Sequence, residues 1–148
     1  MAAATALPGA AVYGLRRSVQ ALPPGIAPVP ADLATGAGFD GLPTAIDTLI
    51  FAPTPAARSE EGYRAIYVDA LSRLFDALPQ PDRSLRLIYV SSTAVYGQDA
   101  GEIVDEGSEC QPQGFNGKVL LEGEQLAARL IDNCVALRLS GLYGPGRH

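Results

Sequence analysis

The chain has 148 residues, a length typical of one domain with its own core. Its hydrophobic content of 47% and charged content of 18% are ordinary for a globular protein. The formal net charge of −5 argues against a nucleic-acid-binding protein, which normally carries a basic face. No apolar run is long enough to predict a membrane span, and the first residues lack the basic start of a secretory signal.

The two cysteines and the single histidine form no metal-ligand spacing, so no metal site is predicted. Cys134 lies inside an apolar run, and Cys110 lies in a polar stretch. Two such cysteines do not make a disulfide framework. We interpret both as reduced thiols and expect a cytoplasmic protein.

Five short segments rich in apolar and β-branched residues predict β-strands. Most of them are continuous apolar runs rather than alternating ones, which is typical of strands covered on both faces. The second contains two prolines. The five segments are residues 11–15, 27–33, 47–53, 85–92 and 135–144.

Two segments carry helix signals. Ser59 is placed as an N-cap before Glu60 and Glu61, and Pro79 ends this first helix. The second helix is predicted over residues 116–132. Apolar residues recur at helical spacing in both, namely Tyr63, Ile66, Tyr67, Ala70, Leu71, Leu74 and Leu78 in the first, and Val119, Leu120, Leu126, Ala127, Leu130 and Ile131 in the second.

The alternation of strands and helices predicts parallel pairing through right-handed crossovers. The predicted fold class is α/β, a Rossmann-like open parallel sheet with helices on both faces. In such sheets ligands bind beyond the carboxyl ends of the strands. Ser91, Ser92 and Thr93 follow the fourth strand at such an end. The alternative is that these hydroxyls only cap nearby backbone groups.

A literal G-x-G-x-x-G is present at Gly36, Gly38 and Gly41. A phosphate-binding loop of this kind needs a helix directly after it. Pro43 follows closely and the next strand begins a few residues later, which leaves no room for that helix. We therefore expect a turn here.

Four ordered motifs carry a family resemblance: "VSSTAVYG", "GEIVDEGSECQP", "GKVLLEGEQL" and "LRLSGLYGPGR". With these motifs in this order, the chain resembles the extended short-chain dehydrogenase superfamily. The resemblance is strongest to its atypical NAD(P)-dependent epimerase/dehydratase-like members. The resemblance implies a single partial NAD(P)-binding Rossmann-like domain over residues 1–148. It also implies that the family's first strand, its glycine-rich turn and its C-terminal substrate-binding portion are absent, and that residues 1–10 are the tail of its first helix. Cofactor binding would then be weak or absent unless a partner chain fills the gap.

The family chemistry is hydride transfer between a nicotinamide and a carbinol carbon. By resemblance, Ser92 holds the substrate oxygen and Lys118 binds the nicotinamide ribose. The family's tyrosine, four residues before the lysine, is replaced here by Gly114, and its neighbour Phe115 has no hydroxyl. Proton transfer would then need a water, Ser92 or another tyrosine such as Tyr96. The alternative for Lys118 is a solvated helix residue paired with the carboxylate four positions later.

The resemblance also implies a nicotinamide dinucleotide cofactor. Arg16 and Arg17 follow the first strand, where arginines favour the 2′-phosphate of NADP and a carboxylate would favour NAD. A plain solvated turn is the alternative at these positions. The further positions carried over for the cofactor are Asp32, Leu33, Ala52, Pro53 and Tyr143.

Three functions compete at this point. The first is an NADP- or NAD-dependent epimerase/dehydratase or oxidoreductase acting on a sugar-nucleotide-like or small carbonyl or hydroxyl substrate. The second is a catalytically inactive nucleotide-binding module. The third is a non-functional fragment that self-associates through the apolar helix face of residues 63–78. The expected partners are the dinucleotide and a small-molecule substrate. Because members of this family commonly form pairs, the resemblance also implies a homodimer. No nucleic acid and no membrane is expected as a partner.

Overall fold

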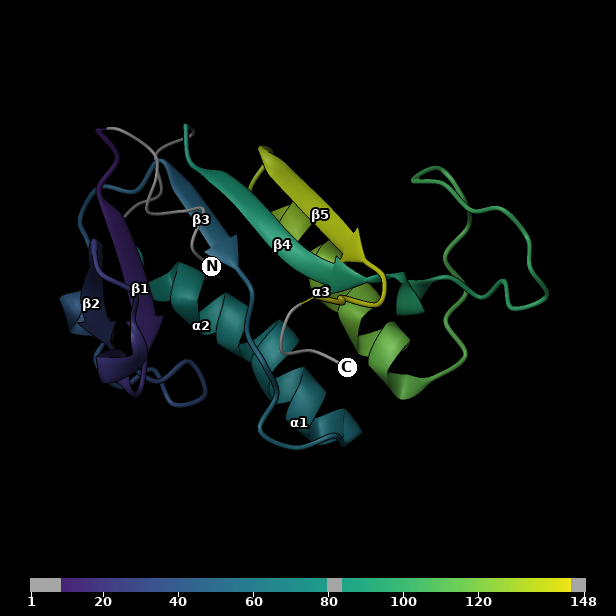
Figure 1. Cartoon of the computed structure of the whole chain (residues 1–148), viewed down its shortest axis with the longest axis horizontal. Coiled ribbons are helices and arrows are strands. Elements are labelled where there is room, and N and C mark those ends of the chain that lie inside the picture. The colour runs from purple at the N-terminus through teal and green to yellow at the C-terminus, as the bar shows by residue number, and fades with distance from the viewer. Residues whose placement is uncertain (1–8, 80–83, 145–148) are drawn as a thin grey trace.

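The computed structural model describes residues 9–79 and 84–144, in which five strands alternate with helical segments (Figure 1). Each predicted strand is confirmed, although the fifth ends before the predicted residue 144. Residues 1–8 of the expected helix tail lie outside the described residues. The strands are β1 (Val12–Arg16), β2 (Ile26–Pro30), β3 (Thr48–Phe51), β4 (Arg86–Ser92) and β5 (Cys134–Leu139).

The first predicted helix is confirmed as three consecutive helical segments. These are α1 (Glu60–Arg64), the π-helical η4 (Ala65–Asp69) and α2 (Ala70–Ala77). Ser59 is the N-cap, and its side chain accepts a hydrogen bond from the Gly62 amide at 3.2 Å. The second is α3 (Phe115–Leu130). The described part of the chain also contains three short 3₁₀ helices, η2 (Val19–Ala21), η3 (Phe39–Gly41) and η5 (Thr93–Val95).

The G-x-G-x-x-G stretch forms a turn, as predicted. Gly36 and Gly38 have φ angles of +79° and +84°, which glycine adopts readily. Only the short η3 follows, so no helix N-terminus is available for a phosphate group.

All strand pairs among the described residues are parallel, and they form two sheets. One sheet has the order β1-β2 and the other the order β3-β4-β5. Parallel strands joined through helical crossovers confirm the Rossmann-like α/β class. Within the part of the chain that the structure describes, no helix is long and apolar enough to cross a membrane.

The core lies between the sheets and the helices. The ring of Phe51 stacks on that of Tyr89, with centroids 5.7 Å apart. The apolar face of residues 63–78 packs into this core, so it is not free for the self-association considered above. The buried cluster comprises Val29, Ala31, Phe39, Phe51, Leu71, Leu74, Phe75, Leu78, Leu85, Leu87, Tyr89 and Ala127.

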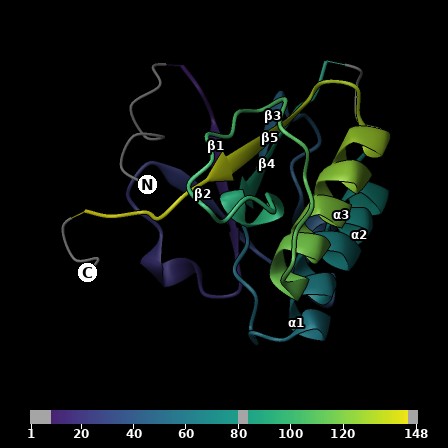
Figure 2. The ribbon, with the colours of Figure 1, turned by 90° about the vertical axis from the view of Figure 1, so that its right-hand side faces the viewer.

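The α-helices lie on one side of the strands (Figure 2). The sequence predicts helices on both faces, whereas α1, α2 and α3 cover one face of β3-β4-β5. The opposite face leaves Ile50 60%, Val135 40% and Leu137 45% exposed. The strands therefore have the apolar sequences of two-sided burial but are covered on one side by the described residues.

Candidate functional site

The predicted site residues gather at one edge of the fold because they follow parallel strands. Arg16 ends β1, Asp32 follows β2, Ala52 follows β3 and Ser92 ends β4. Parallel strands place their carboxyl ends at the same edge, which is where open α/β sheets bind ligands. The topology thus brings together residues that are up to 76 positions apart, counted from Arg16 to Ser92.

The adjacent serines at the end of β4 face opposite sides of the sheet. Successive side chains of a strand alternate between its two faces. Ser91 is 5% exposed and points to the helix side, where its Oγ donates to Glu124 Oε1 at 2.5 Å. Ser92 lies on the other face with Ile88 and Val90, and its Oγ accepts a hydrogen bond from the Ala94 amide at 3.2 Å.

Glu124 is the centre of a buried polar network. Its carboxylate, 7% exposed, accepts hydrogen bonds from Ser91 and from Arg138. The Nη2 of Arg138 lies 2.8 Å from Oε2, and its Nε donates to both carboxylate oxygens at 3.2 Å. These hydrogen bonds raise the pKa of Arg138 above its ordinary value. The network joins α3 to the C-terminal parts of β4 and β5.

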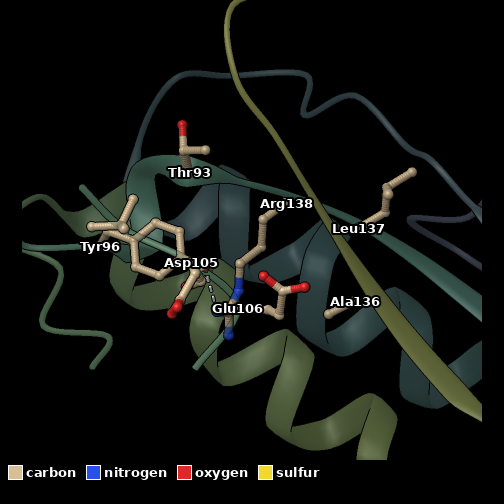
Figure 3. A pocket seen from close by; sticks show the side chains of 8 residues that line it. Thr93, Tyr96, Asp105, Glu106, Ala136, Leu137 and Arg138 are labelled. Carbon is tan, nitrogen blue, oxygen red and sulfur yellow. Dashed lines mark hydrogen bonds between the residues drawn. The ribbon is translucent and has the colours of Figure 1, made fainter. Parts of the chain in front are cut away.

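Arg138 also holds Tyr96 in place (Figure 3). Its Nη1 donates to the Tyr96 Oη at 2.9 Å, and its guanidinium carbon lies 5.0 Å from the ring centroid. The Tyr96 hydroxyl in turn donates to the Asp105 carbonyl oxygen at 2.8 Å. The phenol oxygen therefore both accepts a hydrogen bond, from Arg138, and donates one, to the Asp105 carbonyl.

A shallow pocket opens beside this phenol, with a volume of about 500 Å³. The acidic loop after β4 forms one wall and β5 the other (Figure 3). Asp105 and Glu106 are exposed, and the loop that carries them borders this pocket. The lining residues are Thr93, Tyr96, Val104, Asp105, Glu106, Ala136, Leu137 and Arg138.

Lys118 lies in the first turn of α3, close to the turn that follows Ser92. A Cβ on Gly117 would clash with the Ala94 carbonyl oxygen, so glycine permits the close approach of α3 to η5. Lys118 is exposed and, among the described residues, forms no ion pair. The pairing with Glu122 considered above is not made, because that carboxylate binds Arg64 at 2.5 Å.

The residues at the tyrosine position do not supply a phenol. Gly114 is the N-cap of α3, with extended backbone angles. The Phe115 ring packs edge-on against Tyr63, with centroids 5.6 Å apart, and so belongs to the contact between α1 and α3. The hydroxyl missing from the sequence motif is not replaced by either residue.

The residues predicted to contact the cofactor differ in their exposure and in their hydrogen bonds. Arg16 and Arg17 are exposed. The Asp32 carboxylate accepts from the Ala34 amide at 2.8 Å, which shapes the turn after β2. The Leu33 carbonyl accepts from Arg73 at 3.1 Å, and the Pro53 carbonyl accepts from Tyr67 at 3.3 Å. Ala52 is exposed, and Tyr143 is 96% exposed.

The network of Glu124 and Arg138 is the part of this region that sequence reasoning missed. A signal was present, because each charge interrupts an apolar pattern. Glu124 stands four residues after the buried Leu120, on the stripe that faces the core, and Arg138 stands inside the run "VALRLSG". Charged residues at such positions are seldom buried without a partner.

Comparison with known proteins agrees with this architecture. Residues 56–148 match the family model described as the RmlD substrate binding domain, and the chain belongs to that family. It is also 42% identical to protein YeeZ of Escherichia coli K12 over 95 residues, which is 64% of this chain and 34% of YeeZ. The chain therefore spans about a third of the length of that relative.

Solved structures give the same result for the fold. A protein from Methylobacillus flagellatus, assigned as an NAD-dependent epimerase/dehydratase, is 34% identical with a TM-score of 0.69, and the match covers 92% of this chain and 47% of that one. MoeE5, solved in complex with UDP-glucose and NAD, is 27% identical with a TM-score of 0.75 over 95% of this chain and 49% of its own. The chain is thus similar to about half of each of these proteins.

Proposed function

We propose that this chain supplies the NADP- or NAD-binding edge of an epimerase/dehydratase-type oxidoreductase. Its substrate would be sugar-nucleotide-like or a small carbonyl or hydroxyl compound. The observation that carries the proposal is the gathering of Arg16, Asp32, Ala52 and Ser92 at the carboxyl ends of four parallel strands. The similarity to MoeE5, which binds a sugar nucleotide and NAD, supports the substrate class.

The residues present fit the adenosine half of a dinucleotide. Arg16 and Arg17 are exposed where β1 ends, and no described residue pairs with either guanidinium. A guanidinium binds a phosphate in a bidentate manner, so this pair favours the 2′-phosphate of NADP. For the pyrophosphate, residues 9–79 and 84–144 offer no glycine-rich turn that opens a helix. The affinity of this chain alone would then come mainly from the adenosine side.

In the active form of this proposal, Ser92 orients the substrate and Lys118 holds the ribose. The dinucleotide would supply the hydride. The free ammonium of Lys118 and its closeness to the turn after Ser92 support these two roles. A water or Ser92 itself would carry the proton, because the hydroxyl of Tyr96 is engaged by Arg138 and Asp105.

The second candidate is an inactive nucleotide-binding module. It is favoured by one observation, namely that Gly114 caps α3 where the family places its tyrosine, while the neighbouring Phe115 ring is packed against Tyr63. This candidate would bind the cofactor at the carboxyl ends of the strands but would lack a side chain that transfers the proton.

Thermal unfolding with increasing NADPH or NADH tests the proposal. A ligand that binds only the native state stabilises it by about 2.7 kcal/mol at a hundred times its Kd. We expect NADPH to raise the Tm more than NADH does, and Arg16→Ala with Arg17→Ala to abolish that preference. Arg86→Ala is a control for the loss of positive charge, because it removes one arginine at the opposite end of the strands. A Tm that neither cofactor moves would overturn the proposal.

Turnover separates the two candidates. A panel of sugar nucleotides and simple carbonyl compounds is assayed with NADPH and NADH. Activity that falls in Lys118→Ala and Ser92→Ala supports the enzyme. Cofactor binding without any turnover supports the inactive module.

A further inference from the structure

One continuous helical run, η4 followed by α2, contacts two loops that carry predicted cofactor residues (Figure 1). We call residues 31–38 the β2 loop and residues 52–58 the β3 loop, after the strands that precede them. Tyr67 of η4 donates a hydrogen bond to the β3 loop, and Arg73 of α2 donates one to the β2 loop. Both acceptors are backbone carbonyls, so each contact acts on the path of the loop rather than on one of its side chains.

The β3 loop has little structure of its own. Pro53 and Pro55 have no backbone N–H and favour extended backbone, so neither can donate a turn hydrogen bond. The Pro53 carbonyl accepts from the Tyr67 hydroxyl at 3.3 Å. Among the described residues, no other hydrogen bond reaches residues 53–58. The phenol of Tyr67 is therefore the polar contact that holds this loop.

The position of Tyr67 is itself fixed from two sides. Its carbonyl, in the π-helical segment, accepts from the Tyr89 hydroxyl at 3.3 Å. Gly123 permits α3 to approach the same carbonyl, because a Cβ there would lie 2.8 Å from its oxygen. The Tyr67 ring packs against that of Tyr63, with centroids 5.3 Å apart. π-helical segments often occur at functional sites, and this one holds its phenol against the β3 loop.

The β2 loop is ordered locally, and Arg73 joins it to α2. The Gly36 amide donates to the Asp32 carbonyl at 2.7 Å, and the Asp32 amide donates to the Ala37 carbonyl at 2.9 Å. The Leu33 carbonyl accepts from Arg73 Nη1 at 3.1 Å. A Cβ on Gly36 would lie 2.8 Å from the Arg73 Cδ, so the arginine stem packs on this glycine. Arg73 pairs with no carboxylate in the described part of the chain, so its hydrogen bond goes to the loop instead.

We propose that Tyr67 and Arg73 are positioning residues, which hold the β3 and β2 loops in the form that the dinucleotide contacts. This inference rests on the proposed function, because it concerns loops that carry predicted cofactor residues. Neither side chain has to touch the cofactor. Each acts through a loop carbonyl, and the loss of either donor lets that loop sample other positions. The apparent Kd then rises in inverse proportion to the fraction of molecules whose loop is in the binding form.

The two contacts should affect NADPH and NADH alike. If a variant leaves about a tenth of the molecules in the binding form, the apparent Kd rises about 10-fold. Neither loop contains Arg16 or Arg17, the residues assigned to the 2′-phosphate, so both cofactors should lose affinity by the same factor. Replacing Arg16 and Arg17 should instead change the ratio of the two affinities. The two kinds of role can therefore be told apart.

NMR relaxation of backbone amides tests the loops directly, without cofactor. The amides of Thr54 and Ala34 belong to the same planar peptide groups as the two acceptor carbonyls. Tyr67→Phe removes the hydroxyl and keeps the ring, and we expect the order parameter of Thr54 to fall from about 0.85 toward about 0.6. Arg73→Met removes the donor and keeps most of the stem, and the order parameter of Ala34 should fall in the same direction. Relaxation dispersion at both amides detects slower exchange.

Titration with NADPH and NADH completes the test, and the chain offers matched controls. Tyr63→Phe controls for the loss of a hydroxyl, because the Tyr63 hydroxyl forms no hydrogen bond with a described residue. Arg129→Met controls for the loss of charge, because Arg129 is exposed on α3 and has no ion-pair partner among residues 9–79 and 84–144. Neither control should change the loops or the Kd. Arg73→Lys keeps a charge and a donor, and should recover most of the affinity lost in Arg73→Met.

The outcomes separate this inference from the proposed function. Looser loops together with equal losses of NADPH and NADH affinity would support it. Unchanged relaxation at Thr54 and Ala34 would overturn it, and so would looser loops with an unchanged Kd. If the wild-type chain binds neither cofactor, the proposed function fails, and the relaxation data alone then decide whether Tyr67 and Arg73 hold the loops.

Discussion

The ion pair of Glu124 and Arg138 offers the sharpest test of how this fold is held together. Replacing Arg138 by methionine keeps much of the side-chain volume but leaves the Glu124 carboxylate, only 7% exposed, with Ser91 as its remaining partner. Stranding a buried charge in this way costs about 3–5 kcal/mol. Because Arg138 is 21% exposed, we expect a loss near the lower end, about 3 kcal/mol.

The double variant shows whether the loss comes from the stranded charge. Glu124→Met with Arg138→Met removes both charges, so we expect it to be more stable than Arg138→Met alone by about 2 kcal/mol.

The assay is urea unfolding, with Arg86→Met as the control. Arg86 is exposed at the start of β4, and its replacement should change the free energy of unfolding by less than about 0.5 kcal/mol. A loss below about 1 kcal/mol in Arg138→Met, or losses that simply add in the double variant, would refute the reasoning.

Three further predictions concern the helices. Arg64 lowers the pKa of Glu122, so the stability that this exposed pair contributes is lost as the pH falls. Arg64→Ala should raise the pKa of Glu122 in an NMR titration. The urea midpoint should barely change, because the pair is exposed. A Cβ on Gly123 would clash with the Tyr89 hydroxyl, so Gly123→Ala should cost about 1–3 kcal/mol by urea unfolding, part of which Tyr89→Phe should restore. Ser59→Ala removes the N-cap of α1 and should cost about 1 kcal/mol in the same assay, whereas Ser59→Asp should not.

The helices could be predicted because their signals are local. The cap at Ser59, the acidic first turn and the periodic apolar face all act within a few residues, and the structure confirms them. The π-helical segment Ala65–Asp69 could not be predicted in this way. Its carbonyl at Tyr67 accepts from Tyr89, a residue of β4, so the contact depends on how the helix packs against the sheet.

The location of the candidate site could be predicted from the order of the strands, whereas its buried ion pair could not. The carboxyl ends of parallel strands lie at one edge, so Arg16, Asp32 and Ser92 lie there regardless of their side chains. The location of the site therefore followed from the order of strands and helices. The pairing of Glu124 with Arg138 depends on the relative position of α3 and β5. No local pattern fixes that position.

The exposure of one face of β3-β4-β5 could not be predicted from the sequences of its strands. Continuous apolar strands predict burial on both faces, yet Ile50, Val135 and Leu137 are partly exposed. Pro28 and Pro30 lie in β2, an edge strand of its sheet, where a missing backbone N–H is tolerated. The sequence of a strand therefore does not fix how much of each face the described helices cover.

The hydroxyl cluster at the end of β4 can now be divided by function. Strand alternation sends Ser91 toward Glu124, where it satisfies a buried carboxylate, and that contact is structural. Ser92 points to the uncovered face, where it accepts one local hydrogen bond and keeps its own proton to donate. If this is right, Ser91→Ala should lower the free energy of unfolding by about 1–3 kcal/mol, because it removes a partner of the buried charge. Ser92→Ala should leave urea unfolding nearly unchanged and alter only ligand-dependent measurements, and a larger loss of stability in Ser92→Ala than in Ser91→Ala would contradict this division.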